Sequence, residues 1–467
     1  MAGNGEWEMR LSLVANVLMG TLVGDCTFNG FAIDSRDVKP GDIFVCLKGA
    51  RVDGHDYICQ AKENGAVGYL CEKPLKTELP FLIVPSALEG LQLFSAWYRD
   101  NLQAKVVAVT GSVGKTTTKE CIASVLSRTY QTHKTAGNKN SETGLPLTLL
   151  GIQKDDQVVV AEMGMSAKGE IKVLSDIARP DIAVITNIGV SHIENLGSQE
   201  NILQAKLEIL SGLQKDGILV LNYDDAYLKC AYDNELNGRI TQKIIRYGIH
   251  NSECDVCAQD IVMEDGSMRF LAQTPNGEVT IIMPCEGVHN VYNALASIAV
   301  GISMQVPLPE ICEGLKYFKN VPLRQQFYEK DGFQVLEDCY NASPTSMKAA
   351  IDVLCHKNAR KIAVLGDMLE LGDFTAELHR DVGRMLKNVD VLVAFGQFTK
   401  YYIEGASAVG MDTEMCFSCK DAFEAAKILS CIAKQGDYIL VKASRGLQAE
   451  NVMIHFFELR SNLNFVF

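Results

Sequence analysis

The stretch that most constrains this chain is KVVAVTGSVGKTTTK, residues 105–119. It begins with an apolar, β-branched run at 106–109, which predicts a buried strand. A glycine-containing turn follows at 111–114, and a helical pattern then runs from Lys115 to about Tyr130. A strand, a glycine turn and a helix in this order are typical of a phosphate-binding loop.

Each residue type in this loop has a chemical reason to be there. Glycines let backbone N–H groups close around phosphate oxygens, and the helix N-terminus adds a partial positive charge. Lys115 can reach the β- and γ-phosphates, and the Thr116 hydroxyl can bind Mg²⁺. Val109 replaces the first glycine of the full consensus, so the pattern is T-G-x-x-G-K-T. We favour a nucleotide site over a plain βα turn, formed by Gly111, Ser112, Val113, Gly114, Lys115, Thr116 and Thr117.

Length and composition limit the possible functions. A chain of 467 residues predicts two to four domains. The formal charge of −13 argues against nucleic acid or an anionic membrane as the main partner. The opening MAGNGEWEMR has no apolar signal core, and no apolar stretch is long enough to span a bilayer. We therefore expect a cytoplasmic protein without membrane insertion.

The fifteen cysteines are scattered through apparent core segments, which indicates reduced thiols rather than a disulfide framework. Cys254 pairs with Cys257, and Cys416 with Cys419, in C-x-x-C spacing. The two pairs are far apart and fall in different predicted domains, so we favour ordinary buried thiols over a zinc site.

The pattern of elements predicts an α/β protein of three domains. Residues 1–102 form a small α/β domain, and residues 103–320 form a P-loop ATPase-like domain whose mixed sheet includes antiparallel hairpins at 255–283. Residues 321–467 form a Rossmann-like, doubly wound domain. Its predicted strands are 334–336, 361–365, 391–395, 438–441 and a weaker one at 415–417. No G-x-G-x-x-G follows the first of these strands, so we predict no dinucleotide site there.

Several polar residues stand where α/β domains bind ligands. Glu162 directly follows the strand 158–161 and is a candidate Mg²⁺ carboxylate, although a strand-end acid on the surface is the alternative. His192 follows the strand 181–188, but a lone histidine is more often structural. Lys206, on a predicted helix at 199–212, is by its pattern a solvated surface charge.

Other polar clusters are ambiguous from the residues alone. Asn290 and Asn293 share one helix face. Arg324 follows a candidate hinge at 320–323 and can bind phosphate bidentately. The clusters at 34–36 and 49–55 are typical of solvated loops, and the one at 137–144 is typical of a turn.

The loop variant, the segments GNKNSETG and GVHNVYNALAS, and the strand ends EDCYNASP, LGDMLELG and KASRG resemble the Mur ligase superfamily, whose members build amide bonds on peptidoglycan precursors. The resemblance covers essentially the whole chain in the expected motif order. The branch that adds a diamino acid carries a D-N-P-R signature, which is missing here. The resemblance therefore favours the branch that adds D-alanyl-D-alanine.

This resemblance implies an ATP-dependent amide ligase. It would join D-Ala-D-Ala to UDP-N-acetylmuramoyl (UDP-MurNAc)-tripeptide through an acyl phosphate. The implied cofactors are ATP, two Mg²⁺ ions and CO₂ held as a carbamate on Lys206, which requires a neutral lysine amine. We expect a monomer with small-molecule substrates and no nucleic-acid partner.

The resemblance also implies residue roles. The catalytic residues would be Lys115, Glu162, His192 and Lys206, with Thr116 and Glu162 on the first metal and His192 and Lys206 on the second. Asn290 and Asn293 would contact adenine, Arg324 phosphate and Asp338 the ribose. The substrates would meet Ser35, Arg36, Gly49, Asp53, Asn138, Asn140, Asp367, Lys442, Ser444 and Arg445. The chain departs from the family pattern at Ser141, Leu323 and Ser343, where the family usually has Asn, Gly and Asn.

Two alternatives stay open. One is another Mur-type ligase, either diamino-acid-adding or folate-polyglutamate-forming. The other is a P-loop ATPase that hydrolyses ATP only to change shape. A ligase releases phosphate only when both an acid and an amine substrate are present, and a switch does not need them.

Overall fold

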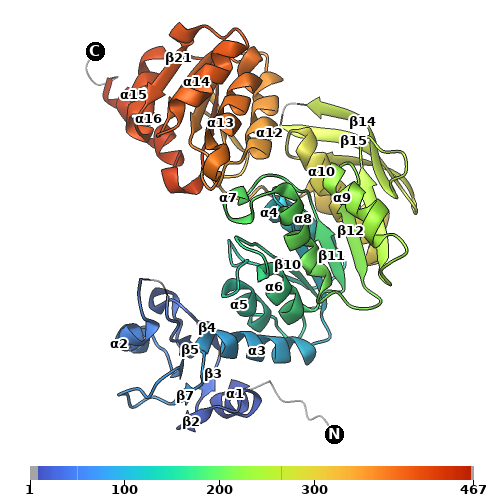
Figure 1. The fold of residues 1–467 in the computed structure, drawn as a ribbon, viewed down its shortest axis with the longest axis vertical. Helices are drawn as coiled ribbons and strands as arrows, with labels where there is room; N and C mark the ends of the chain where they lie inside the picture. Colours follow the sequence, from blue (N-terminus) through green and yellow to red (C-terminus); the bar gives the residue numbers. More distant parts are fainter. Residues whose placement is uncertain (1–8, 50, 265, 464–467) are drawn as a thin grey trace.

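The computed structural model describes residues 9–49, 51–264 and 266–463. The first eight residues, Ala50 of the 49–55 cluster and Asp265 of the predicted hairpin turn lie outside that description. Three α/β domains follow one another along the long axis of the molecule, with the phosphate-loop domain in the middle (Figure 1). The predicted fold class is confirmed.

The predicted strand and helix around the glycine turn are β8 (Lys105–Thr110) and α4 (Lys115–Leu126). Helix α4 ends four residues before Tyr130, because the N–H groups of Thr129 and Tyr130 both turn back to the carbonyl of Leu126. Strand β8 lies between β10 (Val158–Glu162) and β11 (Ile182–Ile185), parallel to both. The carboxyl ends of these three strands therefore meet at one edge of the sheet.

The central sheet has nine strands in the order β16-β15-β14-β13-β12-β11-β8-β10-β9. Its remaining strands are β9 (Thr132–Lys134), β12 (Ile218–Asn222), β13 (Lys243–Gly248), β14 (Val256–Glu264), β15 (Ser267–Thr274) and β16 (Gly277–Met283). The last three form the predicted antiparallel hairpins. Strands β9 and β13 were not predicted.

Side chains of β8 alternate between two cores, as a strand buried on both faces requires. Val107 and Val109 join the core formed with α4, α10 (Val288–Ser303) and α11 (Leu308–Lys316). Val106 and Ala108 join the core on the opposite face, formed with α5 (Gly144–Leu150), α6 (Glu170–Ala178) and α8 (Gln199–Leu207). The predicted helix at 199–212 is thus shorter, and its last turn at Glu208–Leu210 is a 3₁₀ helix.

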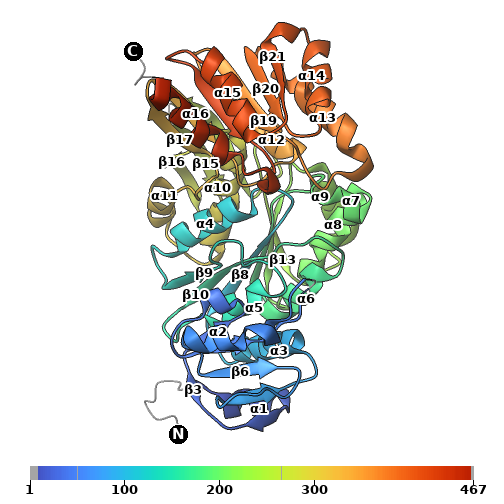
Figure 2. The same cartoon turned by 90° about the vertical axis from the view of Figure 1, so that its left-hand side faces the viewer.

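The amino-terminal domain has a five-stranded sheet in the order β2-β7-β6-β5-β4 and a short β1–β3 pair. Its elements are β1 (Met9–Arg10), α1 (Leu11–Leu18), β2 (Thr21–Val23), β3 (Thr27–Phe28), β4 (Gly30–Ala32), β5 (Asp42–Val45), α2 (Ile58–Glu63), β6 (Gly68–Cys71), β7 (Phe81–Ile83) and α3 (Ala87–Asp100). Helix α3 lies between this sheet and helices α5 and α6 of the central domain (Figures 1 and 2).

The carboxy-terminal domain has a six-stranded sheet in the order β17-β18-β22-β19-β20-β21, parallel except for β17. Its strands are β17 (Gln326–Lys330), β18 (Phe333–Glu337), β19 (Lys361–Gly366), β20 (Val391–Phe395), β21 (Cys416–Cys419) and β22 (Tyr438–Lys442). Helices α12 (Pro344–Cys355) and α13 (Thr375–Arg384) share a core with one face of the sheet, and α15 (Ala422–Ile432) and α16 (Glu450–Leu463) share a core with the other. The remaining helix, α14 (Thr399–Ala408), packs against α13.

The domain limits predicted at 102/103 and 320/321 fall between α3 and β8 and between α11 and β17. The cysteines at all fifteen positions are free thiols. Within the described residues, no helix is both long and apolar enough to cross a membrane, and no three His, Cys, Asp or Glu side chains cluster as a metal site.

Asp181, just before β11, ties α3 to the central sheet. Its carboxylate accepts hydrogen bonds from Arg99 of α3 (3.3 Å), from the Val106 N–H (2.8 Å) and from Lys105 (2.9 Å). The Arg99 side chain is only 10% exposed. We predict that Asp181→Ala lowers the free energy of unfolding by about 3 kcal/mol, because it leaves a buried cation unpaired.

Denaturant unfolding, followed by circular dichroism, measures this change. The matched control is Asp381→Ala, which breaks an exposed ion pair with Arg384 and should cost no more than about 0.5 kcal/mol. Equal losses in the two variants would contradict the prediction.

Candidate functional site

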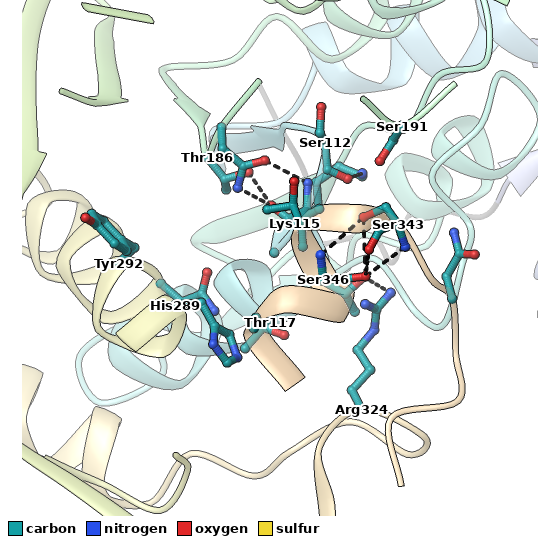
Figure 3. A pocket seen from close by; sticks show the side chains of 18 of the residues that line it. Ser112, Lys115, Thr117, Thr186, Ser191, His289, Tyr292, Arg324, Ser343 and Ser346 are labelled. Carbon is teal, nitrogen blue, oxygen red and sulfur yellow. Dashed lines mark hydrogen bonds between the residues drawn. The ribbon is translucent and has the colours of Figure 1, made fainter. Parts of the chain in front are cut away.

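A cavity of about 840 Å³ lies between the central and carboxy-terminal domains. Its walls come from the glycine loop, from Glu162, Thr186 and Asn222 at the ends of β10, β11 and β12, and from helices α10 and α12. Figure 3 shows Lys115 over the loop, Thr186 beside it, and His289 and Tyr292 on the neighbouring helix α10. The cavity therefore surrounds the motif from which the sequence argument began.

The glycine loop is held in a fixed shape. Gly111 and Gly114 have φ of 144° and 86°, a region that L side chains rarely adopt. Thr186 and Asn187, which follow β11, brace the loop: both donate hydrogen bonds to the Val113 carbonyl, at 2.6 and 2.9 Å. The loop is thus preformed around the position that a phosphate would occupy.

Lys115 folds back over its own loop. Its ammonium donates to the carbonyls of Gly111 (2.7 Å) and Ser112 (3.1 Å). Burial lowers the Lys115 pKa to about 8, although the nearby Glu162 carboxylate acts in the opposite direction. An incoming phosphate would supply the missing counter-charge.

Thr116, Glu162 and Asn140 form one hydrogen-bonded cluster. The Thr116 hydroxyl (3.1 Å) and the Asn140 amide (2.8 Å) both donate to Oε1 of Glu162. Glu162 is 2% exposed, and its Oε2 has no hydrogen-bond partner among the described residues. A buried carboxylate oxygen without a donor, beside a hydroxyl, fits the hard oxygen ligands that Mg²⁺ prefers.

Arg324 connects the hinge to this cluster. Its guanidinium donates to the Thr116 hydroxyl (3.1 Å) and lies 4.1 Å from the ring centroid of Tyr340. Its neighbours Leu323 and Gln325 both have positive φ, 61° and 44°, which is unusual for residues with a Cβ. The hinge backbone is strained where it aims Arg324 at the loop.

Asn290 and Asn293 lie on α10, as predicted from their spacing. Asn293 accepts a hydrogen bond from Thr118 of α4 (2.9 Å) and donates to Asn290 (3.0 Å), which in turn donates to Gln325 (2.6 Å). The two amides thus link helix α4, helix α10 and the hinge along one wall of the cavity.

Asp338 and Lys442 also line the cavity, from the carboxy-terminal domain. Lys442 is buried; it donates to the Asp338 carboxylate and to the Asn341 carbonyl (2.9 Å). Both residues are predicted to contact ligands, and in this structure their opposite charges neutralise each other.

His192 and Lys206 differ in their surroundings. Nδ1 of His192 pairs with Glu370 of the carboxy-terminal domain at 2.6 Å, and both residues have positive φ. Lys206, on α8, is 2% exposed, and its side chain has no hydrogen bond or ion pair within the described part of the chain. Burial, and then the charge of Lys115, hold its pKa well below the ordinary lysine value.

The predicted substrate residues of the amino-terminal domain lie outside this cavity. Arg36 pairs with Asp34, Ser35 donates to Gln60 (2.7 Å), and Asp53 accepts from His55 and Lys73. The Gly49 N–H donates to the Val52 carbonyl (2.9 Å). Asn138 is also absent from the cavity lining, whereas Asn140 is part of it.

A second cavity of about 270 Å³ opens beside His192 and is lined by Ser444 and Arg445. The Ser444 hydroxyl accepts from the Leu369 N–H (3.0 Å), and Arg445 donates to Glu450 (2.6 Å). Asp367 lines neither cavity: it is buried and accepts from the N–H groups of Gln397 (2.7 Å) and Phe398 (3.0 Å).

Sequence reasoning missed several residues that shape the site: Thr186, Asn187, Lys119, Glu370 and Tyr340. Thr186 and Asn187 lie inside the strand predicted at 181–188, whereas the strand in the structure ends at Ile185, so the strand-end rule that found Glu162 was applied too far along the chain to find them. Glu370 and Tyr340 lie in the strand-end segments LGDMLELG and EDCYNASP of the other domain, but no local signal indicated that they would contact His192 and Arg324.

Three family descriptions match successive parts of the chain. They are the Mur ligase family, catalytic domain (residues 27–106), the Mur ligase middle domain (109–301) and the Mur ligase, glutamate ligase domain (323–445). The chain is 38% identical, over 94% of its length and 96% of the relative, to the UDP-N-acetylmuramoyl-tripeptide–D-alanyl-D-alanine ligase of Bacillus subtilis strain 168.

Solved structures agree with this likeness. A MurF structure from Acinetobacter baumannii superposes with a TM-score of 0.88 at 33% identity, covering 96% of this chain and 98% of that one. MurF ligase from Thermotoga maritima in complex with ADP has a TM-score of 0.81 at 31% identity, covering 92% and 97%.

Gly111 offers a direct test of the loop. A Cβ built there would lie 1.9 Å from the Thr186 hydroxyl, and its φ of +144° already disfavours a side chain. We predict that Gly111→Ala weakens ADP binding by roughly 100-fold or more, since the loop must shift before it can close on phosphate. Calorimetric titration with ADP and Mg²⁺ measures this.

The control is Gly410→Ala, at φ +89° with open space where the added methyl group would lie. It introduces comparable backbone strain far from the cavity and should leave ADP affinity unchanged. Unaltered affinity in Gly111→Ala would show that the loop is not the nucleotide site.

His289, on the cavity wall, predicts a pH dependence of stability. Burial lowers its pKa to about 4 from the ordinary 6.5, with Asp338 acting in the opposite direction and Lys442 in the same one. Between these two values the unfolded chain binds a proton that the folded chain does not, so stability falls as pH drops from 6.5 to 4. We predict a loss of about 2 kcal/mol, allowing for the partial exposure of the side chain.

Urea unfolding at pH 7, 5.5 and 4.5 tests this for the wild type and for His289→Gln. The variant lacks the titrating ring and should lose correspondingly less stability over the same range. Identical slopes in the two proteins would remove His289 as the cause.

Proposed function

The chain belongs to the Mur ligase family, and we infer that it is the ATP-dependent ligase that joins D-Ala-D-Ala to UDP-N-acetylmuramoyl-tripeptide, making the pentapeptide precursor of peptidoglycan. The observation that carries this inference is that the chain is 38% and 36% identical, over nearly its full length, to two ligases of that name. The cavity supports it, since the phosphate loop lines a cavity that the central domain shares with the carboxy-terminal domain, while the amino-terminal domain contacts the central domain through α3.

Residues around the loop fit a nucleotide with its metal. Lys115 and the loop N–H groups would hold the β- and γ-phosphates, and Arg324 would reach the same region from the hinge. Thr116 and the free oxygen of Glu162 would hold Mg²⁺. When bound, the metal neutralises charge on the phosphoryl group.

The proposed reaction has two steps. First, a carboxylate oxygen of the tripeptide attacks the γ-phosphorus of ATP, and the bond between that phosphorus and the β-phosphate oxygen breaks. ADP departs, and the tripeptide now carries an acyl phosphate. Second, the amine of D-Ala-D-Ala attacks the acyl carbon, losing a proton, and inorganic phosphate leaves. Lys115 stabilises the negative charge that shifts between oxygens in the first step.

We extend the proposal to Lys206. Its burial, its lack of a described partner and its lowered pKa all favour the neutral amine. A neutral amine adds to CO₂, forming an N–C bond and losing a proton, which yields a carbamate anion. That carbamate, with His192, would offer ligands for a second Mg²⁺, and His192 would first have to leave Glu370.

The two organic substrates would approach from different domains. Ser35, Arg36, Gly49 and Asp53 would hold the uridine diphosphate end, Asn138 and Asn140 would line the reaction centre, and Asp367, Lys442, Ser444 and Arg445 would contact the remaining substrate groups. Asn290, Asn293 and Asp338 would bind the nucleoside. Because these groups lie on three domains, closure would precede chemistry. ATP and a nucleotide-linked substrate favour an enzyme of the cytoplasm, and we propose that it acts as a monomer.

The decisive assay is ATP-dependent phosphate release by the purified protein with Mg²⁺ and UDP-MurNAc-tripeptide. We predict release only when D-Ala-D-Ala is also present, with a pentapeptide product of the expected mass.

Lys115→Met should lower kcat by roughly 10²–10³-fold, as expected for losing one charged stabilising group. Release that ignores D-Ala-D-Ala would favour the ATPase switch, and dependence on a diamino acid or glutamate would favour the other ligases.

Lys206→Ala tests the carbamate. We predict at least a 100-fold loss of activity in the absence of added bicarbonate or short carboxylic acids, because the anionic oxygen ligand is missing. A ¹³C NMR carbamate signal should appear in wild-type protein given labelled bicarbonate and be absent from the variant. Lys172→Ala, which removes an exposed lysine, is the control. Full activity in Lys206→Ala would remove the carbamate from the mechanism.

A further inference from the structure

A row of alternating charges that the proposed reaction does not use ends at Glu162, and its other members do not line the cavity. Lys134 of β9 pairs with Glu120, Glu120 pairs with Lys119 at 2.9 Å, and the Lys119 ammonium lies 3.8 Å from Oε2 of Glu162. Lys119 and Glu120 are adjacent on α4, four and five residues after Lys115. The row therefore runs from the surface to the candidate metal carboxylate.

Lys119 is held by two acceptors other than Glu162. Its side chain is 1% exposed, so its ammonium has no access to bulk water as a substitute partner. It donates to the Thr135 carbonyl at 2.8 Å and contacts Glu120 Oε1 at 2.9 Å. Its 3.8 Å separation from Glu162 is too long for a hydrogen bond.

Glu162 is held from the other side. Oε1 accepts from Thr116 and Asn140, and the Glu162 N–H donates to the Thr135 hydroxyl at 3.0 Å. Thr135 thus contacts both Lys119 and Glu162 and fixes the spacing between them. The result is a buried carboxylate with an ammonium close enough to balance its charge, while Oε2 stays without a hydrogen bond.

We propose that Glu120 is a positioning residue that retains Lys119 and so leaves Oε2 of Glu162 open for the divalent cation. Without an acceptor at position 120, the buried ammonium would find its nearest remaining carboxylate in Glu162 and would move onto Oε2. Lys119 would then compete with the metal for that oxygen. This inference rests on the proposed function, because it assigns the metal to Glu162.

Two substitutions of Glu120 separate the effect of losing its negative charge from the effect of losing its hold on Lys119. Glu120→Gln and Glu120→Met remove the same negative charge, but glutamine keeps an oxygen acceptor for Lys119 and methionine, of similar length, keeps none. A pure effect of charge on the cation would be equal in both variants. If an acceptor at position 120 retains Lys119, Glu120→Met should weaken cation binding strongly and Glu120→Gln only slightly.

The measurement is Mn²⁺ binding to the intact protein in the presence of ADP, followed by the electron paramagnetic resonance signal of free Mn²⁺. We expect Glu120→Met to weaken binding at least tenfold and Glu120→Gln less than threefold. Lys134→Gln, which removes the exposed partner of Glu120, should stay within twofold of wild type. A crystal structure of Glu120→Met should show Lys119 within hydrogen-bond distance of Oε2, whereas in the unaltered protein the separation is 3.8 Å.

Equal weakening by methionine and glutamine, or no weakening by either, would overturn the proposal. Should Glu120→Met fail to fold, Glu120→Ala also lacks the acceptor and is expected to behave in the same way. Glu162→Gln separates a failure of the metal assignment from a failure of the role proposed for Glu120. If it leaves Mn²⁺ binding unchanged, the metal assignment fails and the inference with it. If it abolishes binding while Glu120→Met does not weaken it, only the role of Glu120 is refuted.

Discussion

The register of three parallel strands is the constraint on which this molecule depends. Glu162 pairs with Val109, and Ile185 pairs with Thr110, so the last residues of β10 and β11 lie level with the end of β8. The glycine loop, the candidate metal carboxylate and the loop brace at Thr186 therefore meet without any long side chain having to reach. A shift of either neighbour by one residue would turn Glu162 or Thr186 to the opposite face.

The cost of this arrangement is a concentration of buried charge. Lys115 and Lys206 both have lowered pKa values, and the charge of Lys115 contributes to the shift at Lys206. Opposite charges offset part of the free-energy cost of burying Glu162, but among the described residues Lys115 donates hydrogen bonds only to carbonyls of its own loop. A site built in this way is unfavourable when empty and gains from a polyanion, which is how binding energy can be directed to a nucleotide.

Much of this could be predicted from local pattern, and the failures have physical causes. The strand at 106–109 is a continuous apolar, β-branched run, and a glycine turn marks the start of the helix after it, whereas β9 has three residues and β17 is an edge strand that gains its order from pairing. The strand-end rule found Glu162 because its position directly after an apolar run is a local signal in the sequence. It could not find Glu370 as the partner of His192, since that contact depends on how two domains pack. Lys206 has the pattern of a surface lysine, and its burial depends on tertiary packing.

Closure of the carboxy-terminal domain onto the nucleotide would have to break some contacts of this structure and keep others. His192 is held by Glu370, and Asp338 by Lys442, so two groups proposed to bind ligands are engaged with the carboxy-terminal domain itself. Arg324, by contrast, already donates to Thr116 from a hinge whose flanking residues have positive φ. Rotation about this hinge can therefore release His192 and reposition Asp338 while Arg324 stays beside the loop. The hinge arginine would serve as the fixed point about which the last domain turns onto the nucleotide.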